Sequence, residues 1–118
     1  MRQTINGAEL RRMIISAAAS IEIHKQALNE LNVFPVPDGD TGTNMSMTLN
    51  SAVAELNKLE APTLGRALEV TSSALLRGAR GNSGVILSLF FRGMARSLAG
   101  RSDVDCAGMV QAFRAGAV

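Results

Sequence analysis

Residues 32–45 read NVFPVPDGDTGTNM and lie between two segments with helical patterns. Two prolines fix φ and remove backbone donors, while two glycines permit tight turns, so this stretch is predicted to be a loop. It carries Asp38 and Asp40, and no Lys or Arg occurs from Gln26 to Asn57. Two carboxylates this close repel each other unless one is protonated or a cation lies between them. The loop is therefore predicted to bind a metal ion.

The alternative for residues 38–40 is a Pro-Asp-Gly surface turn, which is common in proteins. Such a turn explains one aspartate. It does not explain the second carboxylate, the polar residues 41–44 or the absence of a countercharge. An EF-hand is excluded because Leu49 stands at the twelfth position of the loop, where a Glu is required.

A second loop, RGARGNSG at residues 77–84, has the character of an anion site. Its glycines leave backbone N–H groups accessible, and Asn82 or Ser83 is expected at the N-terminus of a helix. Arg77 and Arg80 add positive charge. The loop is neither a Walker A loop nor a dinucleotide fingerprint, and its alternative is a tight turn between two helices. An acidic loop suited to Mg²⁺ and a helix N-terminus suited to phosphates are together satisfied by a metal-bound nucleotide.

The first helix is predicted from Asn6, which forms a capping box with Glu9, to the region of Leu31. Its apolar stripe recurs at helical spacing, at Leu10, Ile14, Ala17, Ile21, His24, Leu28 and Leu31. His24 is therefore expected on the buried side. It is either a hydrogen-bonded core residue or a weak candidate for a catalytic group two turns before the acidic loop.

Four further helices are predicted over about residues 43–59, 64–78, 82–100 and 102–118. Their caps are expected to be Thr43 or Asn44, Thr63, Asn82 or Ser83, and Ser102 in a capping box with Asp105. The buried positions expected in the third and fourth of the five helices are Leu64, Ala67, Leu68, Thr71, Ala74 and Leu75, and then Val85, Ile86, Leu89, Phe90, Met94 and Leu98. No strand pattern of useful length appears. The predicted fold class is all-α.

Composition narrows the function classes. The 118 residues correspond to one domain, 1–118, or most of one, with 47% hydrophobic and 19% charged residues. A net charge of +2 and 3% aromatic residues argue against nucleic-acid binding. The single cysteine, Cys106, is expected to be a small core residue in a reducing compartment. With no signal-peptide pattern and no uncharged apolar run of about 18 residues, a cytoplasmic protein without a membrane span is expected.

These two loops give the chain its family resemblance. NVFPVPDGDTGTNM at residues 32–45 and GARGNSGVILS at residues 78–88 resemble the nucleotide-binding (DhaL-like) domain of the dihydroxyacetone kinase family. Within that family, the chain is most similar to the N-terminal domain of bacterial fatty acid kinase. The resemblance implies an antiparallel barrel of about eight helices, of which about five are present here, with Mg-ATP or Mg-ADP at one end.

Position by position, the resemblance implies that Asp38 and Asp40 hold Mg²⁺. It also implies that Thr41, Asn44, Gly81, Asn82 and Ser83 contact the nucleotide. The dihydroxyacetone kinase branch has a third aspartate upstream, where Asn32 is the nearest polar residue here. Either Asn32 serves as a neutral ligand or water replaces the carboxylate, so one or two Mg²⁺ ions are expected.

The activity implied is phosphoryl transfer from ATP to a fatty acid carboxylate held by a separate carrier protein. One alternative acceptor is dihydroxyacetone or a related small ketose. A second alternative is a non-catalytic helical interaction module whose glycine loops are only turns. Apolar helix faces left uncovered by five helices are expected to favour a homodimer.

Overall fold

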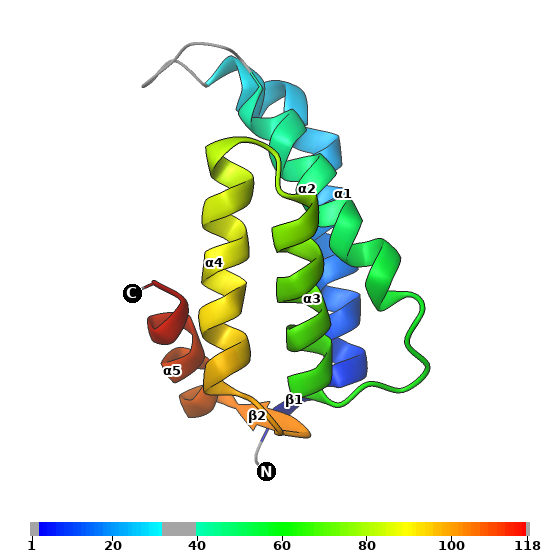
Figure 1. Ribbon diagram of the computed structural model, residues 1–118, viewed down its shortest axis with the longest axis vertical. Coiled ribbons are helices and arrows are strands. Elements are labelled where there is room, and N and C mark those ends of the chain that lie inside the picture. The colour runs from blue at the N-terminus through cyan, green and yellow to red at the C-terminus, as the bar shows by residue number, and fades with distance from the viewer. Residues whose placement is uncertain (1–2, 32–39, 118) are drawn as a thin grey trace.

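The computed structural model describes residues 3–31 and 40–117. Within these residues the chain forms five helices and one small antiparallel sheet (Figure 1). The helices are α1 (Gly7–Glu30), α2 (Thr41–Leu56), α3 (Leu64–Gly78), α4 (Gly81–Ser97) and α5 (Cys106–Ala117), and the strands are β1 (Thr4–Asn6) and β2 (Asp103–Asp105). The all-α prediction is confirmed.

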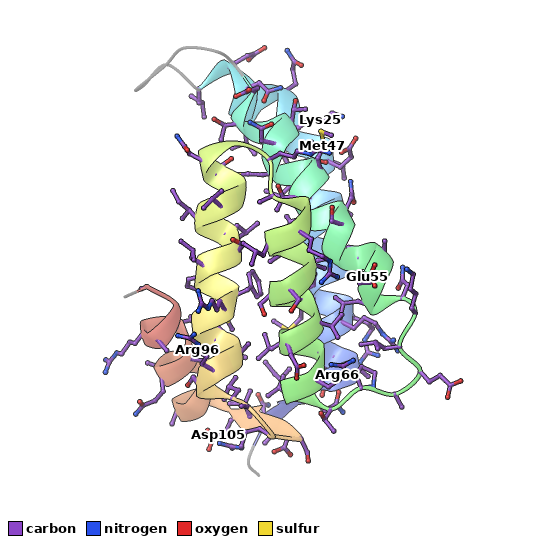
Figure 2. The ribbon with its side chains drawn as sticks, viewed as in Figure 1. Lys25, Met47, Glu55, Arg66, Arg96 and Asp105 are labelled. Carbon is purple, nitrogen blue, oxygen red and sulfur yellow. The ribbon has the colours of Figure 1, made fainter. Side chains whose placement is uncertain are left out.

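Each helix packs against the next one along the chain. Figure 1 shows α3 and α4 side by side and antiparallel, with α5 against the lower half of α4. The end of α1 and the start of α2 lie at the upper end, as does the turn between α3 and α4. The sheet lies at the opposite end, where Figure 2 labels Asp105, while Lys25 and Met47 mark the upper end. Segments far apart in sequence thus share one end of the molecule.

Two apolar clusters form the core. The larger one joins all five helices and β2 and consists of Leu10, Ile14, Leu56, Leu64, Ala67, Leu68, Met94, Leu98, Val104 and Ala112. The second lies among α1, α2 and α3 and consists of Ala18, Leu49, Ala52, Ala74 and Leu75. Three of these five residues are alanines, so the helix backbones approach one another closely here.

The start of α1 agrees with the prediction, but its buried face does not. Asn6 Oδ1 accepts from the Glu9 N–H at 2.9 Å, and Glu9 Oε1 accepts from the Asn6 N–H at 3.2 Å, which confirms the capping box. Beyond Ile14, however, the buried side continues through Ala18 rather than Ala17. Ala17 lies at one edge of the predicted stripe and is exposed, whereas Ile21, further along the same stripe, packs against the second cluster.

The predicted face of α4 is right in its second half and wrong in its first. Met94 and Leu98 are buried and Phe90 packs against the core as expected, but Val85, Ile86 and Leu89 are 44%, 66% and 50% exposed. In the first half the side that packs inward carries Gly84 and Ser88 instead, with Leu87 against the second cluster. The small side chains let α4 approach its neighbours closely, as Gly84 does at Thr48.

The sheet and the start of α5 differ from the prediction as well. Ile5 pairs with Val104, which is buried, and strands of three residues are too short to leave an alternating pattern in the sequence. Helix α5 then begins at Cys106, because Asp105 Oδ1 accepts from the Gly108 N–H at 2.8 Å. The cap is therefore Asp105 and not Ser102. Cys106 is exposed in the first turn and is not a core residue.

Arg11 of α1 closes the C-terminal end of α2. Its guanidinium donates to the carbonyl oxygens of Leu56 at 3.1 Å, Leu59 at 2.5 Å and Glu60 at 3.4 Å. The last carbonyls of a helix lack partners within the helix and attract positive charge. This contact helps to end α2 at Leu56, three residues before the predicted end.

We expect Arg11→Met to lower the free energy of unfolding by about 1–2 kcal/mol, because hydrogen bonds to carbonyl groups are lost while most of the apolar stem is kept. Urea denaturation followed by circular dichroism measures the change. Arg12→Met is the matched control, since Arg12 is exposed and makes no hydrogen bond to the described residues. Equal stability of the two variants would show that the Arg11 contacts do not stabilise the fold.

Candidate functional site

Helix α2 begins earlier than predicted, directly after the acidic loop. Asp40 is its N-cap residue, and the Asp40 carbonyl accepts from the Asn44 N–H at 2.8 Å. Thr41 is the first helical residue. Thr43 and Asn44, predicted as caps, are instead the third and fourth residues of the helix. Asp40, Thr41 and Asn44 therefore lie within the first turn of α2.

The first turn of α2 is fixed to α1 by Asn29. Its side-chain oxygen accepts from the Thr43 N–H at 3.1 Å, and its Nδ2 donates to the Thr43 hydroxyl at 3.0 Å. The first N–H groups of a helix have no acceptor within the helix, so Asn29 supplies from α1 the acceptor that a local cap would supply. Fourteen residues separate the partners, and no local sequence signal identifies this role for Asn29.

Gly42 permits the close contact between α1 and α2. A Cβ at this position would collide with the Lys25 carbonyl oxygen and would lie 2.8 Å from the Lys25 Cα. Gly42 is buried, and the half-buried residues Asp40 and Thr41 precede it. The glycine thus holds the start of α2 directly against the backbone of α1.

Thr48 joins α2 to the turn between α3 and α4. Its buried hydroxyl donates to the Asn44 carbonyl at 2.7 Å and accepts from the Arg80 N–H at 3.0 Å. A Cβ at Gly84 would lie 2.5 Å from this hydroxyl oxygen, and one at Gly78 would collide with the side chain of Ser51. The glycines of the second loop therefore allow the loop to pack closely against α2.

Gly81 and Asn44 bring the two predicted loops together. Gly81 has φ +67°, in the left-handed region that favours glycine, and a Cβ there would lie 2.5 Å from Asn44 Nδ2. Gly81 is also the first residue of α4, followed by Asn82 and Ser83 in its first turn. Five predicted nucleotide-contacting residues thus lie in two helix starts that touch each other.

The positive charge predicted beside the second loop is accessible. Arg77 lies in the last turn of α3 and Arg80 is the N-cap residue of α4, and both are exposed. The first N–H groups of α4 also point out of its N-terminal end, where the helix dipole is positive. This end of the molecule therefore combines positive potential at α4 with the Asp40 carboxylate at α2.

His24 is not on the buried side, so this part of the prediction is wrong. It is exposed, and its Nδ1 lies 2.8 Å from the Ser20 carbonyl oxygen, one turn earlier in α1. His24 follows Ala17 by seven residues, about two helical turns, and lies on the same exposed edge of the stripe. Asp38 and Asn32, the other predicted metal ligands, lie outside the described residues.

A polar contact between α1 and α2 borders this region. Ser46 is buried, and its hydroxyl donates to Glu22 Oε2, while Lys25 Nζ lies 2.8 Å from Glu22 Oε1. These hydrogen bonds, first from Lys25 and then from Ser46, lower the pKa of Glu22 from its ordinary value of 4.5. No pattern in the sequence predicts this contact of Glu22 with Ser46.

Because the pKa of Glu22 is lower in the folded chain than in the unfolded chain, its carboxylate stabilises the fold above about pH 4.5, and this contribution is lost as the pH falls through the folded-state pKa. We expect Glu22→Gln to flatten the fall in stability as the pH is lowered below about 4.5, where the carboxylate takes up its proton. Urea denaturation at a series of pH values measures this. Glu60→Gln, at an exposed residue outside the helices, is the control and should leave the slope unchanged.

Among residues 3–31 and 40–117, no group of three or more His, Cys, Asp or Glu side chains is placed to hold a metal ion. The predicted metal site therefore depends on joining Asp40 to Asp38. Within the same residues, no helix combines the length and the apolar character needed to cross a bilayer.

Comparison with known proteins identifies the family of the chain. The DAK2 domain family matches residues 35–118. Protein YloV of Bacillus subtilis is 39% identical over 114 residues, and an uncharacterized protein of Staphylococcus epidermidis is 40% identical over 116 residues. These alignments cover 97% and 98% of this chain but 21% of each relative, so the chain spans about a fifth of their length. The chain belongs to the DAK2 domain family.

Proposed function

We propose that the first turn of α2, the preceding acidic loop and the first turn of α4 together bind a nucleotide with Mg²⁺. The observation that carries this proposal is the contact between Gly81 and Asn44. It joins an acidic helix start to a glycine-containing helix start, and neither alone provides for both a cation and phosphates.

The residues present suit these ligands. Asp40 offers carboxylate oxygens, Thr41 a hydroxyl and Asn44 an amide oxygen, and Mg²⁺ prefers oxygen donors. On the other side, any side chain at position 81 would fill the space against the Asn44 amide, so glycine keeps the backbone of the turn accessible. Asp38 is proposed as the second carboxylate and Asn32 as a neutral ligand of this group.

In phosphoryl transfer, catalysis consists mostly of positioning and charge neutralisation, and bound Mg²⁺ supplies much of that neutralisation. In our proposal the N–H groups of α4, with Asn82 and Ser83, hold the phosphates. Arg77 and Arg80 add positive charge beside them, and Thr48 fixes the distance between the two helix starts. His24 has no part in this proposal, because it is exposed and its Nδ1 faces the Ser20 carbonyl.

We further propose that the acceptor is a fatty acid carboxylate held by a carrier protein. A carboxylate oxygen forms a bond to the γ-phosphorus as the bond to the β,γ-bridging oxygen breaks, giving an acyl phosphate and ADP. The DAK2 family supports kinase chemistry of this general kind. Dihydroxyacetone, whose hydroxyl would be the acceptor, is the second candidate, because it gives the kinase family its name.

The test uses the full-length protein that contains this domain. We expect Asp38→Ala to abolish Mg-ADP binding in calorimetry while the helical content stays unchanged. Asp103→Ala, in β2 at the opposite end, is the matched control and should bind normally. Unchanged affinity of the Asp38→Ala protein would overturn the assignment. ADP formation with fatty-acid-loaded carrier, compared with ADP formation with dihydroxyacetone, distinguishes the two acceptors.

A further inference from the structure

Charge is unevenly distributed along the chain. Residues 61–102 contain six arginines, no lysine and one acidic residue, Glu69. The Glu69 carboxylate lies 2.9 Å from the Arg66 guanidinium. Arg92 and Arg96 of α4 are both exposed, and neither forms an ion pair with any described residue.

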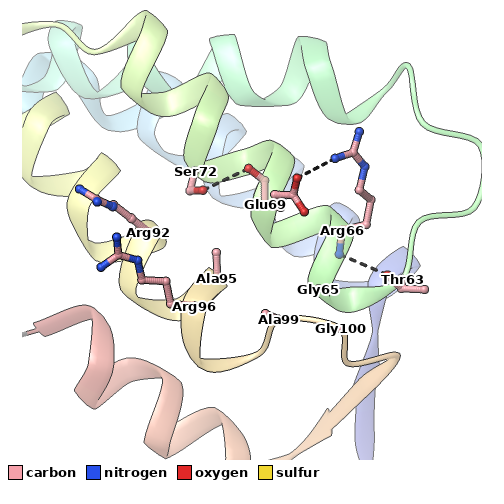
Figure 3. A pocket seen from close by; sticks show the side chains of 10 residues that line it. All are labelled: Thr63, Gly65, Arg66, Glu69, Ser72, Arg92, Ala95, Arg96, Ala99 and Gly100. Atoms are coloured by element: carbon pink, nitrogen blue, oxygen red, sulfur yellow. Dashed lines mark hydrogen bonds and ion pairs between the residues drawn. The ribbon is translucent and has the colours of Figure 1, made fainter.

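Arg92 and Arg96 stand one helical turn apart, so their positive charges repel each other. Figure 3 shows the two guanidinium groups turned to the same side of α4, while Arg66 is held by Glu69 on α3. An arginine fork fits a carboxylate with two parallel hydrogen bonds. The pair is therefore suited to an acidic ligand that relieves the repulsion.

The two arginines line a groove between α3 and α4. One hollow of about 420 Å³ is lined by Arg92 and Arg96 and by the paired Arg66 and Glu69, with small residues such as Gly65 and Ala95 between them. A second hollow of about 170 Å³ shares Arg92 and Ser72 with the first, so the two are continuous. Its further lining consists of Ser73, Ser88 and two leucines, Leu76 and Leu89, which are 59% and 50% exposed.

The groove thus has a cationic part and an apolar part in line. A small anion would use only the arginines, whereas an amphipathic helix with acidic and leucine-like side chains on one face uses both parts. We propose that the groove between α3 and α4 docks an acidic amphipathic helix of a partner protein, with Arg92 and Arg96 binding its carboxylates and Leu76 and Leu89 contacting its apolar face.

The arginine part of this surface is separate from the proposed nucleotide site. Arg92 follows Gly81 by eleven residues on α4, which corresponds to about 16 Å along the helix. Different substitutions are therefore expected to abolish nucleotide binding and partner docking. If one of the two proposals fails its test, the other still stands.

The test uses a labelled synthetic helix with Glu and Leu at i, i+4 spacing, titrated into the protein and followed by fluorescence anisotropy. We expect Arg92→Gln with Arg96→Gln to weaken binding about tenfold or more, and Leu76→Ser with Leu89→Ser to weaken it about fivefold. Arg12→Gln with Arg114→Gln removes the same charge from exposed positions elsewhere and should change binding less than about twofold. Circular dichroism checks that every variant keeps its helices.

Three results would overturn the proposal. The first is no binding of the acidic helix, or an equal loss in the control variant. The second is displacement of the helix by inorganic phosphate at equal concentration, which would indicate a plain anion site. The third is binding to phosphatidylglycerol vesicles, but not to the helix, that is lost in the Arg92 and Arg96 variant, which would indicate a membrane surface.

Discussion

Gly42→Ala is expected to lower the free energy of unfolding by about 2 kcal/mol or more, although alanine normally favours a helix over glycine by about 1 kcal/mol. The new methyl group would collide with the Lys25 carbonyl oxygen and lie 2.9 Å from the Leu28 Cβ. Both contacts belong to the neighbouring helix α1, and the closer one is to its backbone, so α2 must move as a unit. That movement would also displace Asp40 and Asn44.

Urea denaturation of Gly42→Ala measures this effect, and Asn50→Ala is its control. Asn50 lies on the exposed side of the same helix, so alanine there changes helix propensity without a collision. We expect Asn50→Ala to be as stable as the parent or slightly more stable. A Gly42→Ala protein that gains stability in the same way would show that α1 and α2 do not approach as closely as described.

Gly81→Ala is expected to impair both the fold and the proposed nucleotide site. The left-handed backbone at φ +67° costs a residue with a Cβ about 1–2 kcal/mol. In addition, the methyl group would lie 2.5 Å from Asn44 Nδ2 and force the amide away from the turn. We therefore expect about 2 kcal/mol of lost stability and at least tenfold weaker Mg-ADP binding, measured by urea denaturation and calorimetry on the full-length protein.

Gly100→Ala separates the two contributions. Gly100 also has a left-handed backbone, with φ +77°, but a Cβ there would meet nothing within 4 Å. It should lose only the backbone contribution and keep its nucleotide affinity. If Gly81→Ala and Gly100→Ala lose equal stability and neither loses affinity, Asn44 does not depend on the space left by Gly81.

Helix α3 shows what local pattern can predict. Its predicted cap, its end at Gly78 and all six predicted buried residues agree with the structure. The helix has only 15 residues, and its apolar and polar sides are clearly separated, so one face is available for burial. The capping box of α1 is equally local, since it depends on two residues three positions apart.

Helix α4 shows where pattern is insufficient. Apolar residues occur on several of its sides, so hydrophobicity does not select one face. Gly84 and Ser88 face inward because small residues there allow close packing, including the approach of Gly84 to Thr48. The buried face of α4 depends on which helices pack against it, and the local sequence pattern does not contain that information. For this reason Val85, Ile86 and Leu89 are predicted to be buried although they are exposed.

The candidate site also has a part that the sequence predicts and a part that depends on the whole fold. The sequence predicted that an acidic loop and a glycine-rich helix start belong together, and the contact between Asn44 and Gly81 places two of the predicted residues side by side. Asn29 and Thr48, which fix the two helix starts, depend on hydrogen bonds that span 14 and 32 residues. Such contacts leave no periodic signal, whereas the loops carry recognisable residue types.

Hydrogen–deuterium exchange of the full-length protein tests the central claim, that the two helix starts form one Mg-nucleotide site. With ADP and Mg²⁺ together, we predict slower exchange in peptides covering residues 36–48 and 77–86, and no comparable change with either ligand alone. Protection of only one of these segments, or equal protection by ADP without Mg²⁺, would contradict the account.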